Sequence, residues 1–145
     1  MNSSAMVTWE GGLKDGKGRV TAARGAFTDL ALSYATRFEG AYEPGTTPEE
    51  LVAAAHASCF SMALANALGK AGYPPLEIHT TATVTLGVHE DQPTITTSHL
   101  TTRAVVPHID PAQFEHFAQA TKLACPISRL MKAEITLEAT LEGPR

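Results

Sequence analysis

Residues 47–75 read TPEELVAAAHASCFSMALANALGKAGYPP, and this stretch decides the fold. Thr47 suits a helix N-cap, Pro48 suits the first helical position, and Glu50 completes a Thr-x-x-Glu capping box. Gly72 and the prolines that follow it are a helix stop signal. The pattern predicts a helix of roughly 24 residues, about 36 Å long. Its middle is apolar on every side, which is typical of a helix that is buried all round.

A membrane span is the alternative interpretation of this helix, because Leu51–Leu68 holds 18 residues without a formal charge. Four polar side chains interrupt the run, and much of the rest is alanine: His56, Ser58, Ser61 and Asn66. The segments on both sides have the pattern of strands in a soluble domain, so a buried helix is favoured. A central helix this apolar in a small chain also indicates that a partner subunit helps to cover it.

Length and composition restrict the class of protein. A chain of 145 residues is expected to form one domain, over residues 1–145. The net charge of −4 and the lack of a basic stripe argue against nucleic acid as a partner. The N-terminal residues lack the features of a signal peptide, so we expect a cytoplasmic protein whose thiols are kept reduced. Cys59 and Cys125 are then expected to be free or redox-active, and without clustered partners they make a poor zinc site.

The remaining segments predict strands and one further interrupted helix. A hairpin, a third strand at Ser33–Phe38, a second hairpin, a helix with a short continuation after Pro126, and a closing strand are expected, in that order. The hairpin strands are Ala5–Glu10 with Gly18–Ala23 and Glu77–Leu86 with Thr94–Val106; the helix starts at Pro111 and the last strand is Glu134–Leu141. This order predicts an α+β fold with mostly antiparallel sheets.

The two cysteines are the first candidates for chemistry. A buried cysteine in an apolar helix, such as Cys59, is most often a small hydrophobic residue. Cys125 precedes Pro126, so it lies at the N-cap of the short helical piece, where the helix dipole favours a reactive thiolate. If the two residues meet in the fold, one can act as a nucleophile and the other as a resolving thiol. Their separation along the chain leaves that question open.

Three further polar residues are candidates for function, because the sequence gives them no clear structural role. His56 lies one turn before Cys59 and could serve as a base for that thiol. A hydrogen-bonded core histidine is the favoured interpretation. Glu49 is left over once Glu50 caps the helix, and Arg37 is a lone cation in a neutral segment. The remaining histidines have no metal-ligand spacing: His79, His89, His99, His108 and His116.

Three segments closely resemble the OsmC/Ohr family of thiol-dependent hydroperoxide reductases, and within it the OsmC branch. They are TRFEG at Thr36–Gly40, GTTPEELVAAAHASCFSMAL at Gly45–Leu64 and ACPISRLMKAEITL at Ala124–Leu137. The similarity extends over nearly the whole chain. It implies an OsmC-like fold in an intertwined homodimer, with the long helices in the middle and the active sites at the subunit interface.

The resemblance also implies roles for four residues. Cys59 corresponds to the peroxidatic thiol and Cys125 to the resolving one. The arginine before the FEG sequence, Arg37, faces the reactive thiol in the OsmC branch, and the glutamate after the helix-starting proline, Glu49, holds that arginine. In the Ohr branch the arginine comes from a position near Arg19, which is the alternative to Arg37.

The implied activity is reduction of organic hydroperoxides to alcohols, in defence against oxidative or osmotic stress. The reaction passes through a sulfenic acid on Cys59 and a Cys59–Cys125 disulfide. It needs no metal, haem, flavin or other cofactor, only an external dithiol or a lipoylated protein as reductant. Two other functions stay open: a dimeric binding protein for a small apolar ligand with inert thiols, and a general thiol–disulfide oxidoreductase, against which the absence of a CxxC motif counts.

Overall fold

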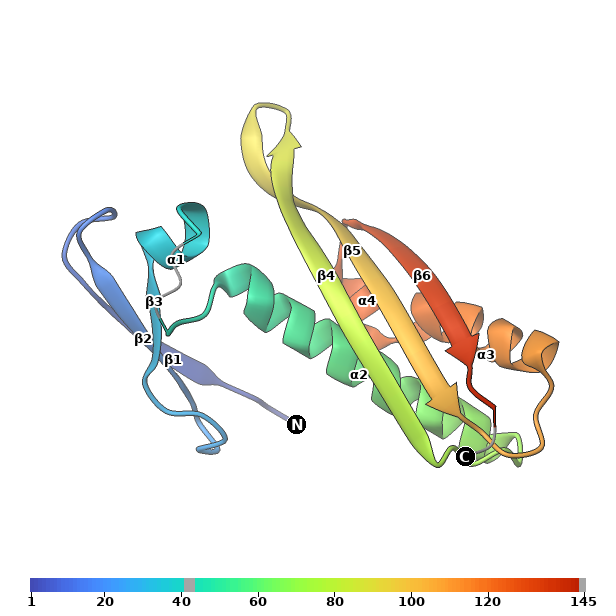
Figure 1. Ribbon diagram of the computed structural model, residues 1–145. Helices are drawn as coiled ribbons and strands as arrows, with labels where there is room; N and C mark the ends of the chain where they lie inside the picture. The colour runs from blue at the N-terminus through green and yellow to red at the C-terminus, as the bar shows by residue number, and fades with distance from the viewer. Residues whose placement is uncertain (41–43, 144–145) are drawn as a thin grey trace. The chain divides into compact units, whose positions relative to one another are not determined.

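The computed structural model describes residues 1–40 and 44–143. The chain forms two compact units, Met1–Leu51 and Val52–Arg145. The first unit holds a three-stranded antiparallel sheet of β1 (Ala5–Glu10), β2 (Lys17–Ala22) and β3 (Leu30–Ser33), drawn in blue in Figure 1. The predicted first hairpin is therefore confirmed, with Trp9 opposite Gly18. A Cβ atom at Gly18 would lie 2.9 Å from the Trp9 ring and 2.7 Å from Leu32, so a larger residue there would force these side chains to move.

A short helix replaces most of the third strand expected at Ser33–Phe38. Only Ser33 belongs to β3, and the next five residues form α1 (Tyr34–Phe38). The reason is a capping box: Ser33 Oγ accepts from the Thr36 N–H at 3.1 Å, and Thr36 Oγ1 accepts from the Ser33 N–H at 3.0 Å. This local hydrogen bonding outweighs the strand-like composition of the segment, and it places Arg37 in the last turn of α1.

The long helix α2 (Pro48–Lys70) starts and ends where the sequence predicts. The Glu50 N–H donates to Thr47 Oγ1 at 3.0 Å, while the Glu50 carboxylate accepts from Thr46 Oγ1 at 2.9 Å. Gly72 has a φ of +89°, and the Tyr73 N–H donates to the Leu68 carbonyl at 2.8 Å. Such a left-handed residue followed by a backward hydrogen bond is a common helix C-cap.

Within one chain, α2 is not buried on every side as the sequence suggested. A single stripe is buried, formed by His56, Phe60, Leu64 and Leu68, whereas Met62 is 74% exposed. The reason is that the core of the second unit lies against this one face of the helix. In the part of the chain that the structure describes, α2 is also the one helix long and apolar enough to cross a membrane, by length and composition alone.

The second unit packs helices on one face of a three-stranded sheet (Figure 1). The strands are β4 (Glu77–His89), β5 (Gln92–Val105) and β6 (Glu134–Leu141), and the further helices are α3 (Pro111–Ala124) and α4 (Pro126–Leu130). β4 and β5 form the predicted antiparallel hairpin, but β6 runs parallel to β5. The sheets are therefore mostly antiparallel, with this parallel pair as the exception.

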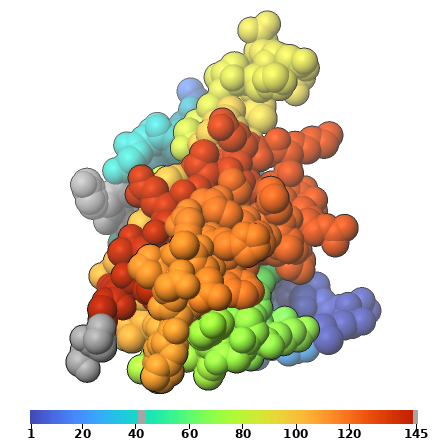
Figure 2. Space-filling model, turned by 90° about the vertical axis from the view of Figure 1, so that its right-hand side faces the viewer, coloured from blue at the N-terminus to red at the C-terminus, as the bar shows by residue number. Residues whose placement is uncertain are grey.

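The core of the second unit lies between α2, α3 and the inner face of the sheet. Its fully buried members include Phe60, Leu64, Leu100, Phe114 and Cys125. On the outer face, alternate residues of β4 and β6 are exposed, as strand periodicity requires. Figure 2 presents another side of this unit, where the orange side chains of α3 lie between the red ones of β6 and the green ones that follow α2.

Candidate active site

Cys59 and Cys125 come from different helices of the second unit. Cys59 lies in the middle of α2 and is half-buried, whereas Cys125 is fully buried. Cys125 is both the C-cap of α3 and the N-cap of α4, with an extended conformation (φ −57°, ψ 131°). The break arises because Pro126 has no N–H for the preceding helix but suits the first position of a new one. The short helix predicted after Cys125 is thereby confirmed.

The two thiols meet. The Cys59 side chain is in hydrogen-bond contact with Cys125, and its sulfur also accepts a hydrogen bond from the Ile127 N–H in the first turn of α4. Both cysteines are free thiols. Burial raises the pKa of the Cys59 thiol, and the neighbouring Cys125 raises it further, against the opposing effect of the Ile127 N–H. The arrangement allows a disulfide between two residues that the sequence alone could not bring together.

His56 does not act on Cys59 as a base in this arrangement. Its Nδ1 lies 2.6 Å from Ser98 Oγ on β5, and its Nε2 lies 2.8 Å from Ser128 Oγ on α4. Burial lowers the pKa of the imidazole, because the charged form is the more costly one to desolvate. The interpretation of His56 as a hydrogen-bonded core residue is confirmed.

Arg37 and Glu49 form an ion pair inside the first unit. Arg37 Nη2 and Nε donate to Glu49 Oε1 at 2.7 and 3.0 Å, and the Glu49 side chain is only 12% exposed. Burial alone would raise the pKa of Glu49, but the hydrogen bond from Arg37, the backbone and the Arg37 charge together lower it below its usual value. Glu49 is therefore ionised at neutral pH and fixes the orientation of the guanidinium group.

Arg19, the alternative arginine, is held less tightly. It lies on β2 with its side chain 47% exposed, and its ion pairs with Glu10 and Asp29 measure 3.6 and 3.9 Å. Exposed pairs of this kind restrict a side chain little. Of the two candidates, Arg37 is the one with a fixed guanidinium.

An apolar pocket of about 400 Å³ adjoins Arg37 in the first unit, a feature that sequence reasoning missed. Its walls are mostly large apolar side chains from the sheet and its β1–β2 turn, from α1 and from the start of α2: Val7, Trp9, Leu13, Leu32, Phe38 and Leu51. The signal available in the sequence was the apolar alternation of β1 and β2, but only the fold of α1 sets Arg37 beside it.

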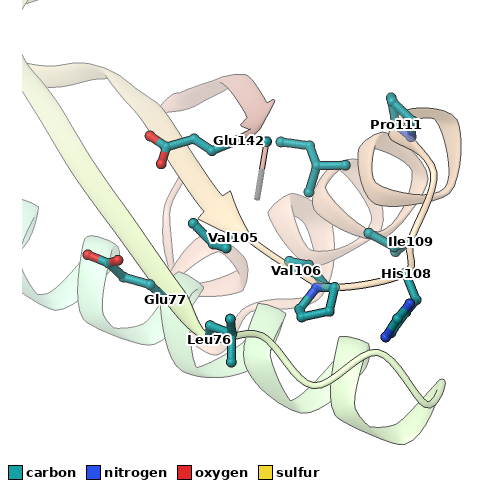
Figure 3. Close-up of a pocket in the computed structure, with 11 residues that line it drawn as sticks. Leu76, Glu77, Val105, Val106, His108, Ile109, Pro111 and Glu142 are labelled. Carbon is teal, nitrogen blue, oxygen red and sulfur yellow. The ribbon is translucent and has the colours of Figure 1, made fainter. Parts of the chain in front are cut away.

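A second pocket, of about 480 Å³, lies at one end of the sheet in the second unit (Figure 3). Leu76, Val105 and Ile109 line it together with the carboxylates Glu77 and Glu142. None of the predicted site residues borders this pocket. Among the described residues, no three histidine, cysteine or acidic side chains are grouped as metal ligands.

Comparison with known proteins supplies the family. The model of the OsmC-like protein family matches residues 39–140. Peroxiredoxin OsmC of Escherichia coli strain K12 and that of Shigella flexneri are each 46% identical to the chain over 143 residues, which is 99% of this chain and 99% of each relative.

Solved structures support the same fold. An OsmC-like protein of unknown function from Vibrio cholerae superposes with a TM-score of 0.77 at 18% identity, over 96% of this chain and 99% of that one. The organic hydroperoxide resistance protein OhrB of Bacillus subtilis superposes with a TM-score of 0.71 at 23% identity, over 96% and 98%. The chain therefore belongs to the OsmC family and is an enzyme of the peroxidase class.

Proposed function

We propose that this protein reduces organic hydroperoxides to alcohols, with Cys59 as the peroxidatic thiol and Cys125 as the resolving thiol. The observation that carries the proposal is the hydrogen-bond contact between the two free thiols, with the Ile127 N–H on the Cys59 sulfur. A pair of reduced cysteines in contact is what a two-thiol cycle requires before it meets an oxidant.

The proposed reaction has two steps in the protein. The Cys59 thiolate attacks one oxygen of the hydroperoxide ROOH, the O–O bond breaks, and the alkoxide takes a proton to leave as ROH. Cys59 is then a sulfenic acid, whose sulfur Cys125 attacks to form the disulfide and release water. An external dithiol, free or on a lipoylated protein, returns both residues to thiols by disulfide exchange. None of these steps needs a cofactor.

We assign to Arg37 and Glu49 the stabilisation of the negative charge that develops in the first step. In the active assembly, Arg37 stabilises the Cys59 thiolate and the departing alkoxide, as a fixed cation does at a developing anion. Glu49 keeps the guanidinium plane in place. The tight Arg37–Glu49 pair, compared with the long contacts of Arg19, supports this assignment.

The class of hydroperoxide follows from the pocket beside Arg37. Apolar walls that include Trp9 and Phe38 suit a substrate with a hydrocarbon group and offer little to hydrogen peroxide. We therefore assign organic hydroperoxides as the substrates. From the family we propose protection against oxidative and osmotic stress in the cytoplasm as the role.

The active form is proposed to be an intertwined homodimer. Within one chain α2 keeps Met62 exposed, and large apolar side chains are exposed on α3 and α4 as well, at Leu123 and Leu130. A second copy that covers α2 would bury Met62, as expected for an apolar helix in the middle of a dimer.

The test is stoichiometric oxidation. Reduced protein is mixed with one equivalent of cumene hydroperoxide, free thiols are counted and the intact mass is measured. The expected result is loss of both thiols and of two hydrogen atoms from the mass, absent in Cys59→Ser, with a sulfenic acid that persists only in Cys125→Ser. Thiols that survive excess hydroperoxide would overturn the proposal in favour of a binding protein with inert cysteines.

A further inference from the structure

His56 links three elements of the second unit through one buried side chain. Its two ring nitrogens contact Ser98 on β5 and Ser128 on α4, at 2.6 and 2.8 Å. His56 and Ser98 are completely buried, and Ser128 is 6% exposed. The imidazole thus connects α2, on which it lies, to the central strand of the sheet and to the short helix that follows Cys125.

The helix α4 depends on such contacts. It has only five residues, and its N-cap Cys125 makes no side-chain capping hydrogen bond. A helix this short is not stable by itself, so tertiary contacts must hold it. Ser128 lies in the same turn as Ile127, the donor to the Cys59 sulfur, and the Arg129 N–H closes that turn on the Cys125 carbonyl at 3.0 Å.

We propose that His56 is a positioning residue of the thiol pair: through Ser128 it holds the first turn of α4, and so keeps the Ile127 N–H and the Cys125 thiol against Cys59. The importance of this role for catalysis rests on the proposed function. His56 does not exchange a proton with Cys59. It acts through α4, by raising the effective concentration of Cys125 at the Cys59 sulfur.

The chemistry of imidazole suits this bridge. Neutral imidazole offers one donor and one acceptor, and a serine hydroxyl can take either role, so both contacts form in either tautomer. An apolar side chain of similar size would fill the space but leave two buried hydroxyl groups without partners. A purely structural role predicts only a loss of stability on substitution, whereas a positioning role also predicts a change in the thiol–disulfide equilibrium.

The experiment measures that equilibrium for the full chain. The Cys59–Cys125 disulfide is formed with diamide and then equilibrated with mixtures of reduced and oxidised dithiothreitol. The variants are Ser128→Ala, which removes the α4 end of the bridge, and His56→Gln. The matched control is Ser61→Ala, because Ser61 also lies on α2 and contacts a hydroxyl on the sheet, Thr80 Oγ1 at 2.8 Å, but has no link to α4.

Ser128→Ala is expected to lower the equilibrium constant for disulfide formation about tenfold. This corresponds to a reduction potential about 30 mV less negative than that of wild type. Closure of the disulfide after one equivalent of cumene hydroperoxide is expected to slow by a similar factor, and Ser61→Ala should leave both values at wild type. An equilibrium constant for Ser128→Ala within twofold of wild type would overturn the proposal, even if His56→Gln does not fold. Because diamide replaces the hydroperoxide, a weakened disulfide in a protein that ignores hydroperoxides would refute the proposed function alone.

Discussion

Arg37 and Glu49 are joined by three hydrogen bonds within a unit that holds neither cysteine: Arg37 Nε and Nη2 both donate to Glu49 Oε1, and Nε also donates to Oε2 at 3.3 Å. Arg37 lies in the last turn of the five-residue helix α1, and Glu49 lies in the first turn of the long helix α2. The pair therefore ties a helix of the N-terminal unit to the start of the helix that carries Cys59. Its orientation is set before any substrate arrives, which is what stabilisation of a developing charge requires.

Arg37→Ala is expected to lower kcat/KM for cumene hydroperoxide by about a hundredfold, the cost of removing one fixed donor from a developing oxyanion. The pH at which the rate of Cys59 alkylation by iodoacetamide is half of its maximum should also rise, because the thiolate loses the cation that stabilises it. Arg19→Ala is the matched control and should stay near wild type in both measurements. A dead Arg19→Ala beside an active Arg37→Ala would assign the role to Arg19.

The Glu49 carboxylate gives the folded protein a characteristic acid dependence. Its pKa in the folded state is lowered, so the stabilisation that it provides is complete above the pKa of the unfolded chain and is lost as the pH falls through the folded value. We expect Glu49→Gln to be less stable than wild type at pH 7, with the difference shrinking as the pH falls below about 4.3 and through the lowered pKa of the folded state. Urea unfolding at several pH values measures this, and a difference that is as large at pH 3 as at pH 7 would contradict the ion-pair explanation.

The sequence predicted the elements better than the contacts between them. Periodicity and caps gave the bounds of α2, the existence of the second hairpin and the helix break at Cys125, because these signals are local. The hairpin strands are longer than predicted, since β4 continues to His89 and β5 starts at Gln92. The strand predicted after Ser33 was wrong, because Ser33 and Thr36 form a capping box that outweighs the strand-like composition of the segment. Burial of α2 was overestimated since composition does not say on which side other elements lie.

The site was predictable only in part. The four residues came from the family resemblance, and the structure brings Cys59 to Cys125 and Arg37 to Glu49. The partners of His56 are 42 and 72 positions away in the sequence, so no local pattern indicates them. The Ile127 N–H is a backbone group, which any residue other than proline would provide, and only the fold of α4 reveals it.

His56 should make the protein sensitive to mild acid. Burial lowers its pKa, so the unfolded chain binds a proton near pH 6.5 while the folded chain does not. Stability is therefore complete above that pH and falls as the pH decreases below it, by up to about 1.4 kcal/mol per pH unit. We expect His56→Gln to lose this slope between about pH 6.5 and 5, as measured by chemical unfolding. His116→Gln, which changes an exposed histidine on α3, should keep the wild-type slope; equal slopes in both variants would show that His56 titrates as it does in the unfolded chain.

The exposed apolar side of α2 predicts that a charged substitution there weakens the proposed dimer. Met62 is 74% exposed in one chain, and Val88 near the tip of the β4–β5 hairpin is 72% exposed, so the two positions are matched in exposure. If a second copy covers α2, Met62→Glu buries an unpaired carboxylate and should weaken the dimer by about a hundredfold or more. Val88→Glu changes the same kind of surface away from the helix and should leave the dimer intact. Light scattering after size exclusion, over a range of concentrations, separates the two outcomes. A dimer that survives Met62→Glu but not Val88→Glu would place the interface on the hairpin instead of α2.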